Sequence, residues 1–198
     1  EQAGWRADLI HPNLRGRTNL RFSKIEDLKP CDILFLAMPH GQSMAMLPQL
    51  KSLAPKIIDL AADFRLKDLE DYRVFYGIEH PLPEWLPKFV YGLAELHRDD
   101  LKKADYVACG GCEATAGILA LYPLFKNDLI KNREAILDVK IGSSAGGSQP
   151  SAATHHPIRS GCLRSYKLTG HRHSAEIKQE TAAEKIHLSA TAVDMVRG

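Results

Sequence analysis

The stretch Tyr106-Val-Ala-Cys-Gly-Gly-Cys-Glu-Ala-Thr-Ala-Gly-Ile-Leu-Ala-Leu-Tyr122 carries the signals that decide the fold. Its first residues, 106–108, form a short apolar run typical of a buried strand, and Gly110 and Gly111 predict a tight turn. The apolar residues that follow predict a helix that begins at or near Cys112. The stretch therefore predicts a strand, a turn and a helix with a cysteine at their junction.

The position of Cys112 suits a nucleophile. A thiol in the first turn of a helix faces unpaired backbone N–H groups and the positive end of the helix dipole. Such surroundings favour the thiolate, which is the nucleophilic form of cysteine. The two preceding glycines let a substrate approach the backbone closely. The residues alone leave two interpretations open: a catalytic nucleophile, or a small buried cysteine packed at a strand–helix junction.

Two further apolar segments lie upstream of this unit. Asp32–Met38 and Lys56–Ala61 are continuous apolar runs, typical of strands buried on both faces of a parallel sheet, and a helix is predicted between them at 43–51. This strand–helix–strand order predicts an α/β fold. Ligands of such sheets collect beyond the carboxyl ends of the strands, where Pro39-His40-Gly41 and Arg65 lie. Arg65 suits a phosphate or carboxylate; the alternative is a structural salt bridge to a nearby aspartate, Asp63 or Asp68.

The second half of the chain has a different pattern. Ala135–Ile141 alternates between apolar and polar residues, which predicts a strand of a half-exposed antiparallel sheet. A small-residue loop follows at 142–147, where backbone N–H groups could contact a cofactor. The other expected elements are a loop-like segment at 66–94, a polar helix at 95–103, a strand at 164–169, a helix capped by Ser174 that ends near His187, and a strand at 188–196.

The composition is that of an ordinary globular protein with one or two small domains. The chain has 198 residues, of which 44% are hydrophobic and 25% are charged, with a net charge of +2. This charge is too small to indicate nucleic-acid binding. The sequence contains neither a bilayer-spanning run nor a signal-peptide pattern. Four cysteines do not suggest a disulfide scaffold, so we expect reduced thiols in a cytoplasmic protein.

Two kinds of thiol chemistry are compatible with the motifs. Cys109-x-x-Cys112 is typical of a dithiol redox site or half of a zinc site, with nitrogen ligands available from His171-x-His173. A second C-x-x-C pair is absent, so we predict no metal. The better partner for Cys112 is a histidine that acts as acid or base. Among nine histidines, His171 and His173 stand out because they lie at a strand end before a helix cap.

Six collinear motifs give the chain a family resemblance. The sequence resembles the N-acetyl-γ-glutamyl-phosphate reductases, and more closely their archaeal and lysine-pathway branch, which acts on γ-glutamyl or aminoadipyl phosphates attached to the carrier protein LysW. The motifs are His11-Pro-Asn-Leu-Arg-Gly16, Asp32-Ile-Leu-Phe-Leu-Ala-Met-Pro-His-Gly41, Ile58-Asp-Leu-Ala-Ala-Asp-Phe-Arg65, Val90-Tyr-Gly-Leu-Ala-Glu-Leu96, Gly111-Cys-Glu-Ala-Thr115, and Tyr166-Lys-Leu-Thr-Gly-His-Arg-His-Ser-Ala-Glu-Ile177.

The resemblance implies a particular fold and domain organisation. Residues 1–111 are expected to form a partial Rossmann-type, nucleotide-binding domain that lacks its first βα unit. Residues 112–198 are expected to form part of an α+β semialdehyde-dehydrogenase-like catalytic domain, incomplete at its C-terminus. The chain is therefore expected to be an interior piece of a longer enzyme. The family's arginine-pathway members carry Asn-Pro-Gly-Cys and an aromatic residue, whereas Cys109-Gly-Gly-Cys-Glu113 resembles the carrier-protein branch.

The resemblance also implies a reaction. Cys112 would attack an acyl phosphate, NADPH would reduce the resulting thioester to the semialdehyde, and His173, rather than His171, would be the acid/base. Arg65 and His171 are candidates for binding the substrate, and the LysW carrier and a homo-oligomer are the expected partners. Candidates for the nicotinamide side are Pro39, His40, Gly41, Gly146 and Gly147. The alternatives are free N-acetylglutamyl phosphate as substrate, a redox or zinc module that uses Cys109 and Cys112, and an inactive structural fragment.

Overall fold

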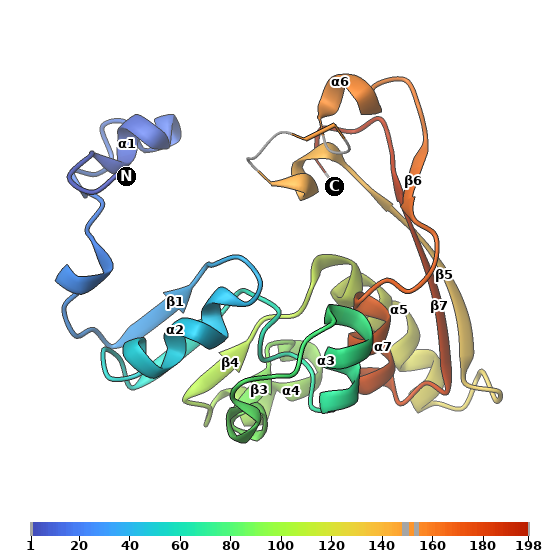
Figure 1. The fold of residues 1–198 in the computed structure, drawn as a ribbon. Coiled ribbons are helices and arrows are strands. Elements are labelled where there is room, and N and C mark those ends of the chain that lie inside the picture. The colour runs from blue at the N-terminus through green and yellow to red at the C-terminus, as the bar shows by residue number, and fades with distance from the viewer. Residues whose placement is uncertain (1, 148–150, 153–154, 198) are drawn as a thin grey trace.

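The computed structural model describes residues 2–147, 151, 152 and 155–197. Two sheets make up the body of the molecule (Figure 1), and the helices α5 (Cys112–Lys126) and α7 (His173–Thr181) pack against each other between them. The first sheet comes from the first half of the chain and the second from the second half. The junction between the sheets is therefore the place where the chain passes from β4 into α5.

The first sheet is parallel throughout. Its strands lie in the order β1 (Ile33–Leu36), β2 (Lys56–Asp59), β4 (Tyr106–Ala108) and β3 (Phe89–Tyr91). The helix α2 (Gln42–Leu50) connects β1 to β2, and α4 (Ala94–Leu101) connects β3 to β4. This arrangement confirms the predicted α/β class, with its carboxyl strand ends at one edge.

Apolar side chains from the strands and α2 form the core beside this sheet. Leu47 and Ile57 are completely buried, and Phe64 stacks on Phe89 with ring centroids 4.2 Å apart. Burying each such side chain contributes about 1.5–3 kcal/mol to folding. The continuous apolar runs in the sequence thus reflect strands and a helix that share one core.

The second sheet is mixed. It contains β5 (Glu134–Ile141), β7 (Lys185–Ala192) and β6 (Arg164–Lys167), in that order. The strand β5 pairs in parallel with β7, and only β6 runs antiparallel. The prediction of an antiparallel partner for residues 135–141 was wrong, because alternation reports that one face is exposed and says nothing about strand direction. The half-exposed face itself is confirmed by the alternating burial of β5.

Residues 66–94 are more regular than the predicted loop. They contain α3 (Leu69–Tyr76), a 3-10 helix (Pro83–Lys88) and β3. The Asp68 carboxylate accepts the Glu70 N–H at 2.9 Å and caps α3. This is a start signal that the loop prediction overlooked. The strand β3 has three residues, which is too short to produce a periodic pattern.

Two helix boundaries also differ from prediction. The helix α7 begins at His173, so Ser174 lies inside its first turn rather than at the cap. It ends at Thr181, because Ala182 adopts a left-handed conformation with φ of 51° and lets the chain turn into β7. Pro123 lies inside α5, near its end, and the helix continues to Lys126.

The remaining elements are short. The N-terminal segment contains α1 (Ala7–Ile10) and two 3-10 helices (Pro12–Leu14 and Ile25–Asp27), and it lies apart from the body in Figure 1. A 3-10 helix (Ser143–Gly146) and α6 (His156–Arg159) lie between β5 and β6. Within the described ranges, the helices are too short or too polar to cross a membrane.

Candidate active site

Cys112 is the first residue of α5, and its side chain is exposed. The strand β4 and the turn before α5 place it there, with Gly111 at the N-cap position. A cavity of about 580 Å³ opens at this point, and its walls come from both halves of the chain. The residues that line it and concern the candidate chemistry are Arg65, Cys112, Glu113, Gly146, Arg159, Tyr166, His171, Arg172 and His173.

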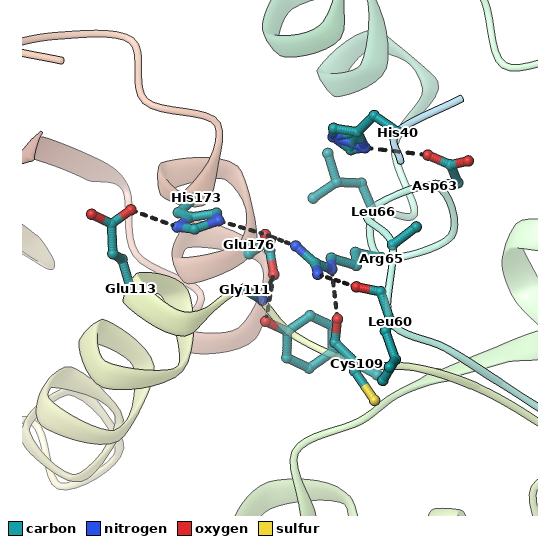
Figure 2. Close-up of polar contacts among 12 residues, drawn as sticks. His40, Leu60, Asp63, Arg65, Leu66, Cys109, Gly111, Glu113, His173 and Glu176 are labelled. Carbon is teal, nitrogen blue, oxygen red and sulfur yellow. Dashed lines mark hydrogen bonds and ion pairs between the residues drawn. The ribbon is translucent and has the colours of Figure 1, made fainter. Parts of the chain in front are cut away.

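His173 lies between two carboxylates at the start of α7. Figure 2 shows its ring with Glu113 on one side and Glu176 on the other. Its Nδ1 lies 3.0 Å from Glu113 Oε2, which is ion-pair distance, although Nδ1 forms no well-aligned hydrogen bond within the described residues. Its Nε2 lies 3.9 Å from Glu176 Oε1 and close above Gly111. The second ring nitrogen is therefore next to the residue that precedes Cys112.

His171 contacts the same carboxylate. Its Nε2 lies 3.1 Å from Glu113 Oε2, and its Nδ1 accepts a 3.2 Å hydrogen bond from the backbone N–H of His173. An accepting Nδ1 carries no proton, so the proton of the neutral ring is on Nε2 and faces Glu113. Burial lowers the pKa of His171, which keeps the ring in this neutral form.

Glu113 is the common acceptor of this cluster. Tyr166, on β6, donates its hydroxyl to Glu113 Oε1 at 2.8 Å, and only 4% of Glu113 is exposed. Burial alone would raise the pKa of Glu113, but the close contact with His173, the hydrogen bond from Tyr166 and the charge of the nearby imidazoles lower it overall. Burial and the bond to Glu113 both raise the pKa of Tyr166. The cluster thus holds an ionised carboxylate beside two imidazoles and a protonated phenol.

The same three side chains have the composition of a metal site. One ligand atom each from Glu113, His171 and His173 lie within 4.8 Å of one another. A metal on His171 Nε2 would need that nitrogen unprotonated, while Nδ1 already accepts the His173 N–H. Both nitrogens of the ring would then lack a proton. An imidazole reaches that state only as an anion. The hydrogen bonds therefore favour a proton-sharing cluster over a metal site.

Arg65 is held by groups inside the protein. Its Nε donates to Cys109 O at 2.5 Å, its Nη2 to Leu60 O at 3.0 Å, and its Nη1 lies 3.3 Å from Glu176 Oε1. The salt bridge considered for Arg65 is thus to Glu176, not to Asp63 or Asp68. Although Arg65 lines the cavity, its bonds point into the wall, and a substrate-binding role for it stays a prediction.

Glu176 completes this wall. It is fully buried and accepts the Gly111 N–H at 3.0 Å and the Tyr91 hydroxyl at 2.7 Å, in addition to its pair with Arg65. The turn before Cys112 is therefore fixed by a carboxylate from α7. Sequence reasoning missed Glu176, although its spacing of three residues after His173 puts both on one face of a helix. Tyr166 begins the sixth motif, but its role was missed, since only the folding of β6 brings it to Glu113.

The residues predicted to contact the nicotinamide lie in two places in the structure. Gly146 lines the cavity with Cys112, and Gly147 follows it with φ of 81°. Pro39, His40 and Gly41 lie beyond the end of β1 and are not among the lining residues. There the Asp63 carboxylate accepts the Gly41 N–H at 2.9 Å and the Met44 N–H at 3.0 Å, and lies 3.3 Å from His40 Nδ1. Asp63 therefore occupies the N–H groups at the start of α2.

The fold and the site together define an α/β protein with a parallel sheet, a second mixed sheet, and a thiol at their junction. Residues 1–104 match the family model of the semialdehyde dehydrogenase NAD binding domain, and residues 112–198 match that of the semialdehyde dehydrogenase dimerisation domain. The chain therefore belongs to the semialdehyde dehydrogenase family.

Two relatives show where in this family the similarity is high. The chain is 48% identical over 191 residues to the [LysW]-L-2-aminoadipate 6-phosphate reductase of Deinococcus radiodurans, covering 96% of the chain and 55% of the relative. It is 46% identical over 208 residues to the [LysW]-L-2-aminoadipate/[LysW]-L-glutamate phosphate reductase of Saccharolobus solfataricus, covering 100% of the chain and 58% of the relative. The resemblance inferred from the six motifs is confirmed, and the chain spans just over half the length of these relatives.

A solved structure supports the fold. Aspartate semialdehyde dehydrogenase II from Vibrio cholerae superimposes with a TM-score of 0.63 at 10% sequence identity, covering 91% of this chain and 57% of that one. The thiol redox or zinc alternative finds no such support. Cys109 is half-buried, burial raises the pKa of its thiol, and in the described part of the chain neither Cys109 nor Cys112 belongs to a three-ligand group.

Proposed function

We propose that this chain carries the catalytic thiol of an NADPH-dependent acyl-phosphate reductase. The substrate is the phosphate of L-2-aminoadipate or of glutamate bound to LysW, and the products are the semialdehyde and free phosphate. The names of the relatives support this substrate class. The observation that carries the proposal is the exposed Cys112 at the start of α5, which shares a cavity with His173.

In this proposal Cys112 and α5 perform the first step. The sulfur attacks the acyl carbon, the carbon–oxygen bond to phosphate breaks, and phosphate leaves with the bonding electrons, so that a thioester remains on Cys112. The unpaired N–H groups in the first turn of α5 stabilise the thiolate and the negative charge that develops beside it. The pair of Glu176 with the Gly111 N–H fixes the turn that orients this helix end.

His173 handles the protons of the second step. When bound, the nicotinamide cofactor supplies the hydride that brings the thioester to the aldehyde level. His173 Nε2, on the Gly111 side of the ring, gives a proton to the substrate oxygen and takes it back when the aldehyde leaves and the thiolate returns. His171 is the less suitable acid or base, since its two nitrogens are engaged by Glu113 and by the His173 N–H.

The described residues fit the nicotinamide end of the cofactor. Gly146 borders the cavity. Among the described residues, chain neighbours apart, no atom lies within 4 Å of a Cβ built at Gly147 or Gly41, so a flat ring can approach the backbone there. Pro39 and His40 lie at the carboxyl edge of the sheet on the same side as Gly41. Because Asp63 takes the N–H groups at the start of α2, this helix end does not hold the phosphates. The preference for NADPH over NADH is part of the proposal.

The domain organisation and the partners are also proposed from the family matches. Residues 1–111 form the nucleotide-binding domain and residues 112–198 the catalytic domain, and the match to a dimerisation domain supports a homo-oligomer. LysW is the partner that presents the acyl phosphate.

The test uses the full-length enzyme. Reduction is followed with LysW-bound aminoadipyl phosphate, LysW-bound glutamyl phosphate and free N-acetylglutamyl phosphate, each with NADPH and with NADH. We expect activity on a LysW-bound substrate, and a loss of at least about 10³-fold in Cys112→Ser. The matched control is Cys31→Ser, an exposed cysteine outside the cavity, which should keep wild-type activity. A folded Cys112→Ser enzyme with the wild-type rate would exclude the thioester mechanism.

A further inference from the structure

We propose that Glu113, the residue after the nucleophile, is a positioning residue that sets the tautomer of His173 and supports its protonated form. The proposal deepens the proposed function and rests on it, since it concerns the same Cys112–His173 pair. It assigns to the side chain beside the reactive thiol the role of orienting the acid/base.

The first argument is the number of polar side chains that converge on one buried carboxylate. Glu113 Oε1 accepts the Tyr166 hydroxyl at 2.8 Å, and Glu113 Oε2 lies 3.1 Å from His171 Nε2 and 3.0 Å from His173 Nδ1. These partners come from β6, from the segment before α7 and from α7 itself. A carboxylate that only filled space would not gather one hydrogen bond and two imidazole nitrogens at ion-pair distance from three segments of the chain.

The second argument concerns which nitrogen of His173 carries the proton. An ionised carboxylate can only accept, so the nitrogen that faces Glu113 must be the protonated one in the neutral ring. His173 Nδ1 then holds the hydrogen, and Nε2 has the free lone pair. That nitrogen lies directly over Gly111, where an added methyl group would overlap it. Glu113 therefore directs the basic nitrogen toward the turn that carries Cys112.

The third argument is electrostatic. The Glu113 carboxylate lies 3.0 Å from His173 Nδ1, so it stabilises positive charge on that ring. Positive charge on His173 in turn stabilises negative charge on the Cys112 sulfur, since both side chains line the same cavity. Other charged or titratable groups around His173 are Glu176 on α7, Arg65 paired with Glu176, and His171, Arg172, Tyr166 and Cys112 at the cavity wall. The contact of Glu113 with His173, at 3.0 Å, is shorter than that of the other carboxylate, Glu176, at 3.9 Å.

The experiment measures the alkylation of Cys112 by iodoacetamide as a function of pH, in the full-length protein. Mass spectrometry follows the peptide that contains Cys112, and the peptide that contains the exposed Cys31 is the internal reference. In Glu113→Gln, which keeps the size but loses the charge and exchanges one acceptor oxygen for an NH2 donor, we expect the Cys112 rate at pH 7 to fall about tenfold and the profile to move to higher pH. In Glu113→Asp, which keeps the charge, we expect partial recovery.

A matched control is available elsewhere in the fold. Glu180 pairs with His97 at 2.5 Å, and the Glu180 side chain is 6% exposed, so Glu180→Gln makes the same chemical change in a histidine–carboxylate pair outside the cavity. Its Cys112 profile should match the wild type. The proposal is overturned if a folded Glu113→Gln protein keeps the wild-type profile, or if Glu113→Asp recovers nothing.

A second measurement needs no substitution at Glu113. In protein whose Cys112 has been alkylated, the ¹⁵N chemical shifts of His173 at neutral pH report which ring nitrogen is protonated. A proton on Nδ1 is the expected result, and a proton on Nε2 alone would overturn the proposal. Neither measurement uses an acyl phosphate or a nucleotide. A failure of the proposed reduction would therefore leave both results interpretable.

Discussion

Arg65 and Glu176 are separated by 111 positions in the sequence, yet their side chains form an ion pair 3.3 Å long in the wall of the cavity. Arg65 follows β2 of the first sheet, and Glu176 lies on α7, which packs beside the second. The guanidinium also holds Cys109 O, while the carboxylate holds the Gly111 N–H. The pair thus fixes both sides of the turn that presents Cys112.

Replacing Arg65 by methionine should destabilise the protein strongly. The Glu176 side chain is fully buried, so loss of Arg65 leaves a negative charge with two hydrogen bonds and without its guanidinium partner. Breaking a buried pair in this way costs about 3–5 kcal/mol in the free energy of unfolding. Urea unfolding measures the difference. The matched control is Arg73→Met, whose exposed pairs with Glu70 and Glu79 should contribute less than about 1 kcal/mol.

A methyl group at Gly111 should disturb the acid/base directly. A Cβ at this position would overlap the His173 ring, so Gly111→Ala must push the imidazole away from its place above the turn. We expect a loss of about 1–3 kcal/mol in stability. We also expect slower alkylation of Cys112. The double variant with His173→Ala removes the overlap, so its loss of stability should be smaller than the sum of the two single losses. Strict additivity would contradict the predicted clash.

Asp63 should hold the loop after β1 in its conformation. Its carboxylate accepts two backbone N–H groups at the start of α2, so Asp63→Ala should cost about 1–2 kcal/mol. If His40 and Gly41 contact the cofactor, the full-length enzyme should also bind NADPH more weakly, as measured by fluorescence titration. Asp68→Ala is the control, because it removes the cap of α3 and leaves this loop intact. Equal NADPH affinities in the two variants would argue against a cofactor role for the loop.

The elements that the sequence predicts best are those with a long local pattern. The runs at 32–38 and 56–61 and the strand–turn–helix around Cys112 have continuous apolar character, and all three form the expected elements. The strand β3 has only three residues, so it leaves no periodic signal. The strand β7 runs parallel to β5, and alternation along a strand contains no information about the direction of its partner.

The candidate site is predictable only in part, for a related reason. The thiol at the start of α5 and the two histidines at the start of α7 are local features, and both line one cavity. The contacts that organise them are long-range: Tyr166 reaches Glu113 across 53 positions, and Glu176 reaches Gly111 across 65. Arg65 has the side chain of an anion-binding residue, but only the fold shows that its nitrogens are engaged by the wall.

The buried carboxyl of Asp59 should make stability depend on pH. Its Oδ1 accepts the Ser43 hydroxyl at 2.8 Å and the Ala61 N–H at 3.0 Å, while Oδ2 has no hydrogen-bond partner within the described residues. Burial raises the pKa of Asp59 to about 6 in the folded protein, above the value of about 3.9 that an aspartate has when unfolded. Between these two values the folded state binds more protons than the unfolded state. The free energy of unfolding therefore falls as the pH rises from about 4 to 6, by about 3 kcal/mol at most, and stays lower above that range.

Asn at position 59 has no proton to lose and keeps the oxygen that accepts both hydrogen bonds. Asp59→Asn should therefore raise the melting temperature relative to the wild type at pH 8, by several degrees, and change it little at pH 4, where the wild-type carboxyl is itself neutral. Differential scanning calorimetry at the two pH values measures this contrast. The exposed Asp99, paired with Lys102, provides the control, since Asp99→Asn should give the same small difference at both pH values. A difference for Asp59→Asn that is equal at pH 4 and pH 8 would show that the carboxyl ionises in the folded protein without penalty.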